Sequence, residues 1–177
     1  LNSQLKASFD FEENLTNGVA GAKEASAIVT GLKNYTGEVV YKEGRTGKAV
    51  QLGKYGLKLN QENLGNDYTV SAWVNADAGL MANQVMMFLG YHNPENWIAI
   101  SGRAYESDKC KVWAKGGIYG THTTFANPEI GRKEWHQITM TGTEDKFSFY
   151  LDGICLGTVD SNNPLSGENQ DIYLGVN

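Results

Sequence analysis

The chain has 177 residues, of which 41% are hydrophobic and 20% are charged, so it is long enough and apolar enough to fold around a core. Its formal net charge is -5 at pH 7 and no run of like charge stands out, which argues against nucleic acid or an anionic membrane surface as a partner. No stretch approaches the roughly 18 consecutive apolar residues of a membrane-spanning helix, so we expect no membrane insertion.

Hydrophobic periodicity predicts an all-β fold. No apolar pattern at helical spacing is long enough for a helix of about ten residues or more. Short runs rich in Val, Ile, Thr and aromatic residues are separated by Gly, Asn and Asp, and no repeat or linker divides residues 1–177, so we expect one domain. The expected strands, in chain order, are Leu5–Phe11, Ala27–Val29, Glu38–Tyr41, Ala49–Gly53, Leu57–Leu59, Tyr68–Asn75, Gln84–Gly90, Asn96–Ser101, Lys109–Lys115, Ile118–Phe125, Trp135–Thr141, Lys146–Asp152, Ile154–Val159 and Asp171–Val176.

The clearest local signal is a β-hairpin near the end of the chain. Phe147, Phe149 and Leu151 alternate with polar or amphipathic residues, which is the period of a strand. Asp152-Gly153 follows, a pair that suits the two positive-φ positions of a type I′ turn.

Two cysteines, Cys110 and Cys155, are too few for a disulfide framework. Burial of both within strands is the simpler interpretation, and a single bridge is the alternative.

Several motifs occur in a characteristic order along the chain, and together they indicate a family. They are Phe9-Asp10-Phe11-Glu12, Gly47–Leu52, Asp67–Val74, Trp135-His136-Gln137-Ile138, Tyr150-Leu151-Asp152-Gly153 and Tyr173-Leu174-Gly175. This succession resembles the concanavalin A-like, laminin-G-like jelly-roll domains of extracellular proteins, which include lectins and carbohydrate-binding modules. The resemblance covers nearly the whole chain. It implies a two-sheet antiparallel jelly-roll β-sandwich with one concave sheet, an extracellular or cell-surface location, frequent attachment to glycoside hydrolases, and often a bound glycan or calcium.

The sequence departs from this pattern at its end. Domains of this kind usually continue past the Tyr-Leu-Gly segment to a last strand that pairs near the first one, whereas this sequence stops at Asn177. We therefore expect Leu5–Phe11 to have an unpaired edge, or to pair with a segment from elsewhere.

No catalytic centre is visible. The laminarinase-type relatives carry Glu-x-Asp-x-x-Glu on one strand, and two of these carboxylates act as nucleophile and acid. Here Glu106-Ser107-Asp108, which we place in a loop, has Lys111 at the third position. The three histidines, His92, His122 and His136, lack paired metal-ligand spacing, and His136 is expected to be a packing residue. We predict that the chain is not an enzyme, although its parent protein could be a glycoside hydrolase.

A calcium site is a further expectation. Asp10 and Glu12 lie in an oxygen-rich turn near the start of the chain, and carboxylate oxygens are the ligands that Ca²⁺ prefers. The resemblance also implies calcium in some members. A solvated turn without metal is the alternative.

Strand parity predicts the ligand-binding residues. Cys110, Val112 and Ala114 alternate with Trp113, which shares its face with lysines and so stands where a core tryptophan would be out of place. The neighbouring strand and the flanking segments, expected to form an antiparallel meander, add polar and aromatic groups to the same region. The predicted site residues are Trp113, Trp97, Tyr91, His92, Arg103, Tyr105 and His122. Trp97 and Trp73 have an alternative interpretation, as half-buried rings on a sheet face that a loop covers.

These observations predict a non-catalytic carbohydrate-binding module of a larger secreted or cell-surface protein, of the bacterial glycan-degrading kind. Its expected partners are an oligo- or polysaccharide, bound on the concave sheet and its loops, and other domains of the same parent chain. The alternative is a protein-interaction or structural spacer domain of a cell-surface protein.

Overall fold

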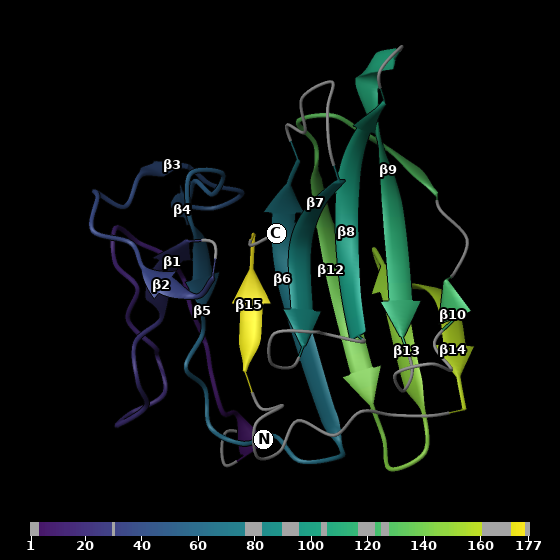
Figure 1. The fold of residues 1–177 in the computed structure, drawn as a ribbon, viewed down its shortest axis with the longest axis horizontal. Coiled ribbons are helices and arrows are strands. Elements are labelled where there is room, and N and C mark those ends of the chain that lie inside the picture. The colour runs from purple at the N-terminus through teal and green to yellow at the C-terminus, as the bar shows by residue number, and fades with distance from the viewer. Residues whose placement is uncertain are drawn as a thin grey trace.

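The computed structural model shows a chain built from antiparallel strands (Figure 1). The structure describes residues 4–29, 31–76, 83–89, 96–103, 106–116, 123–124, 128–160 and 171–175, and between residues 83 and 124 it describes the backbone only, apart from Val112. No helix in this described part is long and apolar enough to cross a membrane.

Two main sheets make up the sandwich. The smaller has the order β14-β13-β12-β6, formed by β6 (Tyr68–Asn75), β12 (Trp135–Gly142), β13 (Phe147–Leu151) and β14 (Ile154–Val159). The larger has the order β10-β9-β8-β7-β15-β5-β1-β2, with β11 also paired to β9. Its strands are β1 (Ser26–Val29), β2 (Lys33–Asn34), β5 (Gly56–Lys58), β7 (Asn83–Leu89), β8 (Asn96–Arg103), β9 (Glu106–Gly116), β10 (Thr123–Thr124), β11 (Glu129–Gly131) and β15 (Ile172–Leu174). A separate hairpin pairs β3 (Tyr41–Glu43) with β4 (Lys48–Val50).

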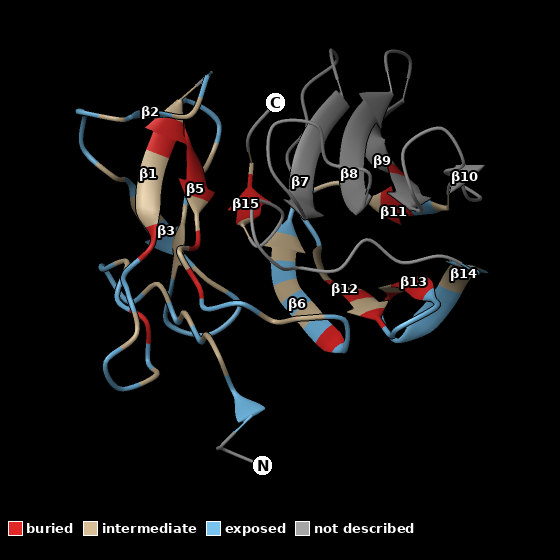
Figure 2. Cartoon of the chain, turned by 60° about the horizontal axis from the view of Figure 1, so that its bottom comes forward, coloured by how far each residue is buried: buried red, intermediate tan, exposed pale blue. Residues whose placement is uncertain are grey.

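The core lies between the sheets. On the smaller sheet, cross-strand pairing places Met140 opposite Phe149, and both side chains are fully buried. Leu57 on β5 and Val112 on β9, which are equally buried, supply the larger sheet's side of the same cluster. Figure 2 shows buried positions on β5, β12, β13 and β15. Alternating burial along β6 and β12 directs one apolar face of the smaller sheet inward, and the buried residues of β5 and β15 meet it from the larger sheet, as expected for a two-sheet all-β sandwich.

The predicted hairpin is confirmed. Leu151 pairs with Ile154, and the two residues between them, Asp152 and Gly153, have φ angles of 49° and 80°. These positive values are those of a type I′ turn, whose twist matches that of the flanking strands. Two strand predictions, Tyr68–Asn75 and Ile154–Val159, agree with β6 and β14 residue for residue.

The first predicted strand is wrong, because residues 5–11 have no strand partner in the structure. Ser8 is held by a loop instead: its N–H donates to Asn17 Oδ1 at 3.0 Å and its carbonyl accepts the Gly18 N–H at 2.7 Å. Phe11 then takes a left-handed conformation with a φ of 57°, which an extended strand does not allow. The expectation of an open strand edge at Leu5–Phe11 is therefore also wrong. Strand β6 is one edge of the smaller sheet, with β12 as its strand partner in the described part of the chain.

Three further expectations need correction. Glu106 opens β9 and is not in a loop. The short strands β2 and β11 were not predicted, since segments of two or three residues are too short to show alternation. Cys155 is a free, exposed thiol, so its expected burial is also wrong. Of the predicted strand Ile118–Phe125, β10 is the part within the described residues.

Candidate functional site

The side of the smaller sheet that faces away from the core is polar. Where β6 pairs with β12, alternate residues such as Val70 and Met140 point into the sandwich. The residues between them form a surface that we call the β6–β12 face: Thr69, Ser71, Trp73, Asn75, Trp135, Gln137, Thr139 and Thr141. Its hydroxyl and amide groups are the kind that form hydrogen bonds with a polyhydroxylated ligand. Two of them already meet across the strands, with Ser71 Oγ 3.0 Å from Thr139 Oγ1.

Trp73 stands on this face and remains 44% exposed. The Cζ atom of Arg45 lies 3.9 Å from the centroid of its ring, which is a cation–π contact. Arg45 belongs to the turn between β3 and β4, so a distant part of the chain reaches the β6–β12 face at this point. A large aromatic side chain that stays this exposed on a polar sheet face is a candidate ligand contact.

The turn that carries Arg45 is held in place from two sides. The N–H of Gly44 donates to the Gly47 carbonyl at 2.9 Å, which closes the turn. Glu12 Oε1 accepts the N–H of Lys48 at 2.9 Å, so the N-terminal segment anchors the start of β4. Gly47 has a φ of 58°, and a Cβ atom there would collide with the Glu12 carboxylate. Arg45 is therefore presented by a well-determined loop.

A large groove runs beside β6. Its volume is about 1910 Å³, and the N-terminal segment, the β3–β4 hairpin, β6 and part of β12 line it. Residues of β1, β5 and β15 and the core-facing Val70, Ala72 and Val74 line it as well, so the groove extends around the open edge of β6. Trp73, Arg45 and Trp135 all line it. The part of the groove along β6 is open and elongated by the length of an eight-residue strand, which suits an extended ligand.

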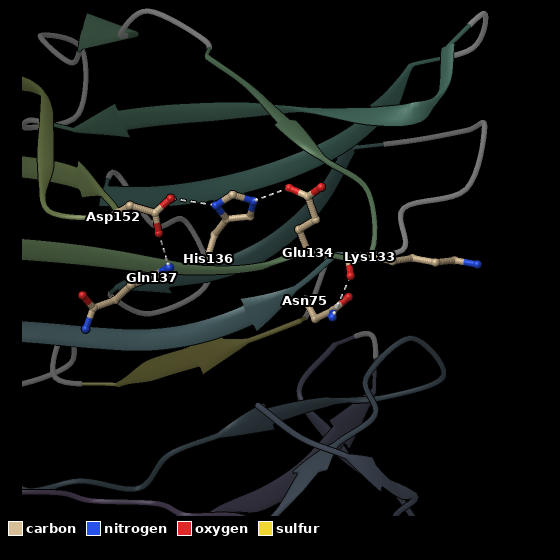
Figure 3. Close-up of polar contacts among 6 residues, drawn as sticks. All are labelled: Asn75, Lys133, Glu134, His136, Gln137 and Asp152. Atoms are coloured by element: carbon tan, nitrogen blue, oxygen red, sulfur yellow. Dashed lines mark hydrogen bonds and ion pairs between the residues drawn. The ribbon is translucent and has the colours of Figure 1, made fainter. Parts of the chain in front are cut away.

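A second polar cluster lies at one end of the same sheet (Figure 3). His136 Nδ1 is 2.7 Å from Asp152 Oδ2, and its Nε2 is 3.7 Å from Glu134 Oε2. Asp152 Oδ1 accepts the N–H of Gln137 at 2.8 Å. Burial raises the pKa of Asp152, but the hydrogen bonds from His136 and the Gln137 N–H and the charge of His136 outweigh it, and the net shift is downward.

The contacts of this cluster stabilise the fold. The His136 side chain is only 16% exposed and lies on the same side of β12 as Ile138 and Met140, as its parity requires. Its contact with Asp152 ties the β13–β14 turn to the neighbouring strand β12. The predicted packing role of His136 agrees with this placement.

The predicted ligand-binding residues fall largely outside the described residues. Tyr91, His92, Tyr105 and His122 are not described, and of Trp97, Trp113 and Arg103 the structure describes the backbone alone. The predicted antiparallel meander is confirmed for β8, β9 and β10, the last being the described part of Ile118–Phe125. In the register of β8 and β9, Trp97 pairs with Lys115 and Ala99 pairs with Trp113. By strand parity these four positions belong to the opposite face of the sheet from the buried Val112. The site itself stays a prediction.

The predicted metal residues contact backbone groups. Asp10 Oδ1 accepts the N–H of Glu12 at 3.2 Å, and Glu12 Oε1 accepts the N–H of Lys48. In the part of the chain that the structure describes, no three or more His, Cys, Asp or Glu side chains are grouped as metal ligands would be. Calcium binding by Asp10 and Glu12 stays a prediction.

Sequence reasoning missed the β6–β12 face. The signal was present, because Trp73 has the same strand parity as the polar residues Thr69, Ser71 and Asn75, which is the parity argument that singled out Trp113. Arg45 had no such signal, since nothing in the sequence pattern predicts that the β3–β4 turn lies over β6.

Comparisons with known proteins agree with this architecture. Residues 52–177 match the family model described as the concanavalin A-like lectin/glucanases superfamily. Among solved structures, domain 4 of AbnA, a GH43 extracellular arabinanase from Geobacillus stearothermophilus in complex with arabinotriose, aligns with a TM-score of 0.73 and 21% identity, covering 98% of this chain and 84% of that one. The carbohydrate-binding module CBM66 from Bacillus subtilis aligns with a TM-score of 0.48 and 14% identity, covering 88% and 89% of the two chains. No curated protein matches the sequence at a significant level. The family match spans most of the chain, which therefore belongs to the concanavalin A-like lectin/glucanases superfamily.

Proposed function

We propose that this chain is a carbohydrate-binding domain and that it holds an extended saccharide in the groove beside β6. The observation that carries the proposal is Trp73, a tryptophan 44% exposed on a sheet face otherwise made largely of hydroxyl and amide side chains. An exposed aromatic ring can stack on the apolar face of a sugar ring. Flanking hydroxyl and amide groups then form hydrogen bonds with the sugar hydroxyls.

The arabinanase domain supports this proposal by its fold. The arabinanase domain was solved with arabinotriose, and it shares the fold of this chain at 21% identity. We extend the proposal to a non-catalytic module of a larger extracellular protein, with other domains in the same parent chain. Lys111 occupies the position where laminarinase-type enzymes place their third carboxylate, which supports the absence of glycosidase activity.

A screen of the chain against a glycan array, followed by titration calorimetry of the glycans bound, tests the function. Trp73→Ala should weaken binding about 10- to 100-fold, which corresponds to about 1–3 kcal/mol for an aromatic anchor. Ile154→Ala is the matched control, because Ile154 is 71% exposed on β14 and lies outside the groove, and it should bind normally.

Trp113→Ala separates the two candidate surfaces. If Trp113→Ala abolishes binding and Trp73→Ala does not, the ligand lies on the β8–β9 surface predicted from strand parity. Repeating the titrations in EDTA tests the calcium proposal at Asp10 and Glu12: unchanged affinity and melting temperature would contradict it.

A protein-interaction role is the second candidate. The eight-residue strand β6 has a strand partner on one edge in the described structure, and an open edge of this length can accept an extended peptide. If no glycan binds on the array, the carbohydrate proposal is wrong and this alternative takes its place.

A further inference from the structure

The guanidinium of Arg45 combines two properties that matter for a ligand. It lies over the Trp73 ring, with Cζ 3.9 Å from the centroid, and the planar guanidinium is a group that stacks on aromatic faces. Its N–H donors lie in the plane at the periphery, so they remain available to a further partner. Arg45 covers one face of the Trp73 ring, and Trp73 keeps 44% exposure with Arg45 in place, so the uncovered part of the ring lies beside the guanidinium within reach of one ligand.

No carboxylate in the described residues satisfies those donors. Ion pairs with carboxylates are formed by three lysines instead: Lys6 with Glu62, Lys48 with Glu13, and Lys58 with Asp171. Arg45 is thus a fixed cation without an acidic partner in that part of the chain. A planar guanidinium matches a carboxylate with two parallel hydrogen bonds, which a lysine ammonium does not reproduce.

The charge of the groove also favours an anionic ligand. The chain as a whole is acidic, with a formal net charge of -5. The groove nevertheless has more cations than acids along its walls: Lys6, Lys42, Arg45, Lys48, Lys54 and Lys133, against Asp10, Glu43 and Asp67. Lys6 and Lys48 pair with Glu62 and Glu13, so the excess of positive charge is small. A concave surface whose local charge opposes that of the whole molecule attracts ligands of the opposite sign.

We infer that the groove selects acidic saccharides, and that Arg45 binds the carboxylate of a uronic acid whose ring lies against Trp73. This inference rests on the proposed carbohydrate-binding function and adds the ligand class to it. Trp73 supplies the contact that any sugar ring can use, and Arg45 supplies the contact that distinguishes an acidic sugar from a neutral one.

Oligouronides and their carboxyl-reduced counterparts provide a matched pair of probes, since reduction converts each carboxylate to a hydroxymethyl group and leaves the linkages intact. The panel comprises oligomers of galacturonic, glucuronic, mannuronic and guluronic acid, titrated into the whole chain at fixed ionic strength. We expect at least one oligouronide to bind at least tenfold more tightly than its reduced form.

Variants then test which residue causes the preference for the oligouronide over its reduced form. Arg45→Gln should remove the preference and leave the weaker binding of the reduced oligomer in place, and Arg45→Lys should restore only part of it. Lys54→Gln removes the same charge from the same groove and should change the preference less than twofold. Trp73→Ala should weaken both forms together.

The outcomes separate the inference from the proposed function. Equal or tighter binding of the reduced oligomers, or binding of neutral glycans only, overturns the inference and leaves the carbohydrate function standing. An equal loss of preference in Lys54→Gln and Arg45→Gln also overturns it, because general charge would then suffice. Failure to bind any glycan, acidic or neutral, overturns the proposed function itself.

Discussion

Two contacts on the same four-stranded sheet join a charged group to a ring, Asp152 to His136 and Arg45 to Trp73, and they have different roles. Asp152 contacts His136 at 2.7 Å, and its second oxygen accepts a backbone N–H, so both of its oxygens are occupied. The Cζ atom of Arg45 lies 3.9 Å from the centroid of the Trp73 ring, and no carboxylate in the described residues forms an ion pair with Arg45. A contact whose hydrogen-bonding atoms are occupied contributes to stability, here with His136 16% exposed and Asp152 42% exposed, whereas an open contact is available to a ligand.

The difference follows from strand parity. His136 lies on the core side of β12, while Trp73 lies on the opposite side of β6, where solvent and the groove begin. Variants at the two contacts should therefore affect different measurements. The expected losses in the free energy of unfolding decrease from the His136 cluster to Trp73.

His136→Ala should have the largest effect on stability. It leaves a partial cavity on the core side and removes the hydrogen-bond partner of a carboxylate, at a cost of about 2–4 kcal/mol. Urea unfolding measures the loss, and the folded fraction should bind its glycan normally. Glu134→Gln is the control: its 3.7 Å contact with His136 is exposed, and it should cost less than about 0.5 kcal/mol. A large loss of glycan affinity in His136→Ala would contradict the separation of the two regions.

Asp152→Asn isolates the charge of the turn residue. Asparagine tolerates the positive φ of 49° and favours a type I′ turn, so the hairpin itself should be unaffected. The loss of the charged hydrogen bond to His136 should cost about 1–2 kcal/mol in urea unfolding at neutral pH. A variant as stable as the wild type would show that the turn alone holds this end of the sheet.

The pH dependence of stability provides an independent test of the same contact. The pKa of Asp152 is lowered in the folded state, so the unfolded state binds its proton first as the pH falls. The contribution of Asp152 is therefore complete above the ordinary aspartate pKa of about 4 and is lost as the pH falls through the lower folded value. The difference in stability between the wild type and Asp152→Asn should shrink over that range. A constant difference down to pH 2 would contradict the assignment.

Gly47→Ala tests the loop that presents Arg45. Alanine is strained at a φ of 58°, and its Cβ would displace the Glu12 carboxylate from the Lys48 N–H. We expect a stability loss of about 1 kcal/mol and a several-fold loss of glycan affinity. Gly31→Ala is matched, since Gly31 has a φ of 74° with open space around its Cα. It should lose similar stability and bind normally, and equal affinity losses in both variants would point to general destabilisation.

Trp73→Ala should have the smallest effect on stability, less than about 1 kcal/mol, because truncating an exposed ring leaves no cavity. Thermal unfolding measures it beside the binding loss expected from calorimetry. An early-melting variant with normal glycan affinity would reverse the roles assigned to the two contacts.

The sequence by itself determined the all-β class, the hairpin at Asp152-Gly153 and the strand Tyr68–Asn75, because alternation and turn chemistry are local properties that a short segment carries with it. It did not determine whether a segment with alternating residues finds a partner: residues 5–11 have the alternation and no strand, since a strand exists only through hydrogen bonds to another one. The candidate site was decided in the same way. Trp73 could have been singled out from its parity, but the position of Arg45 over its ring depends on how the β3–β4 hairpin packs beside β6, and only the tertiary structure brings those two distant residues together.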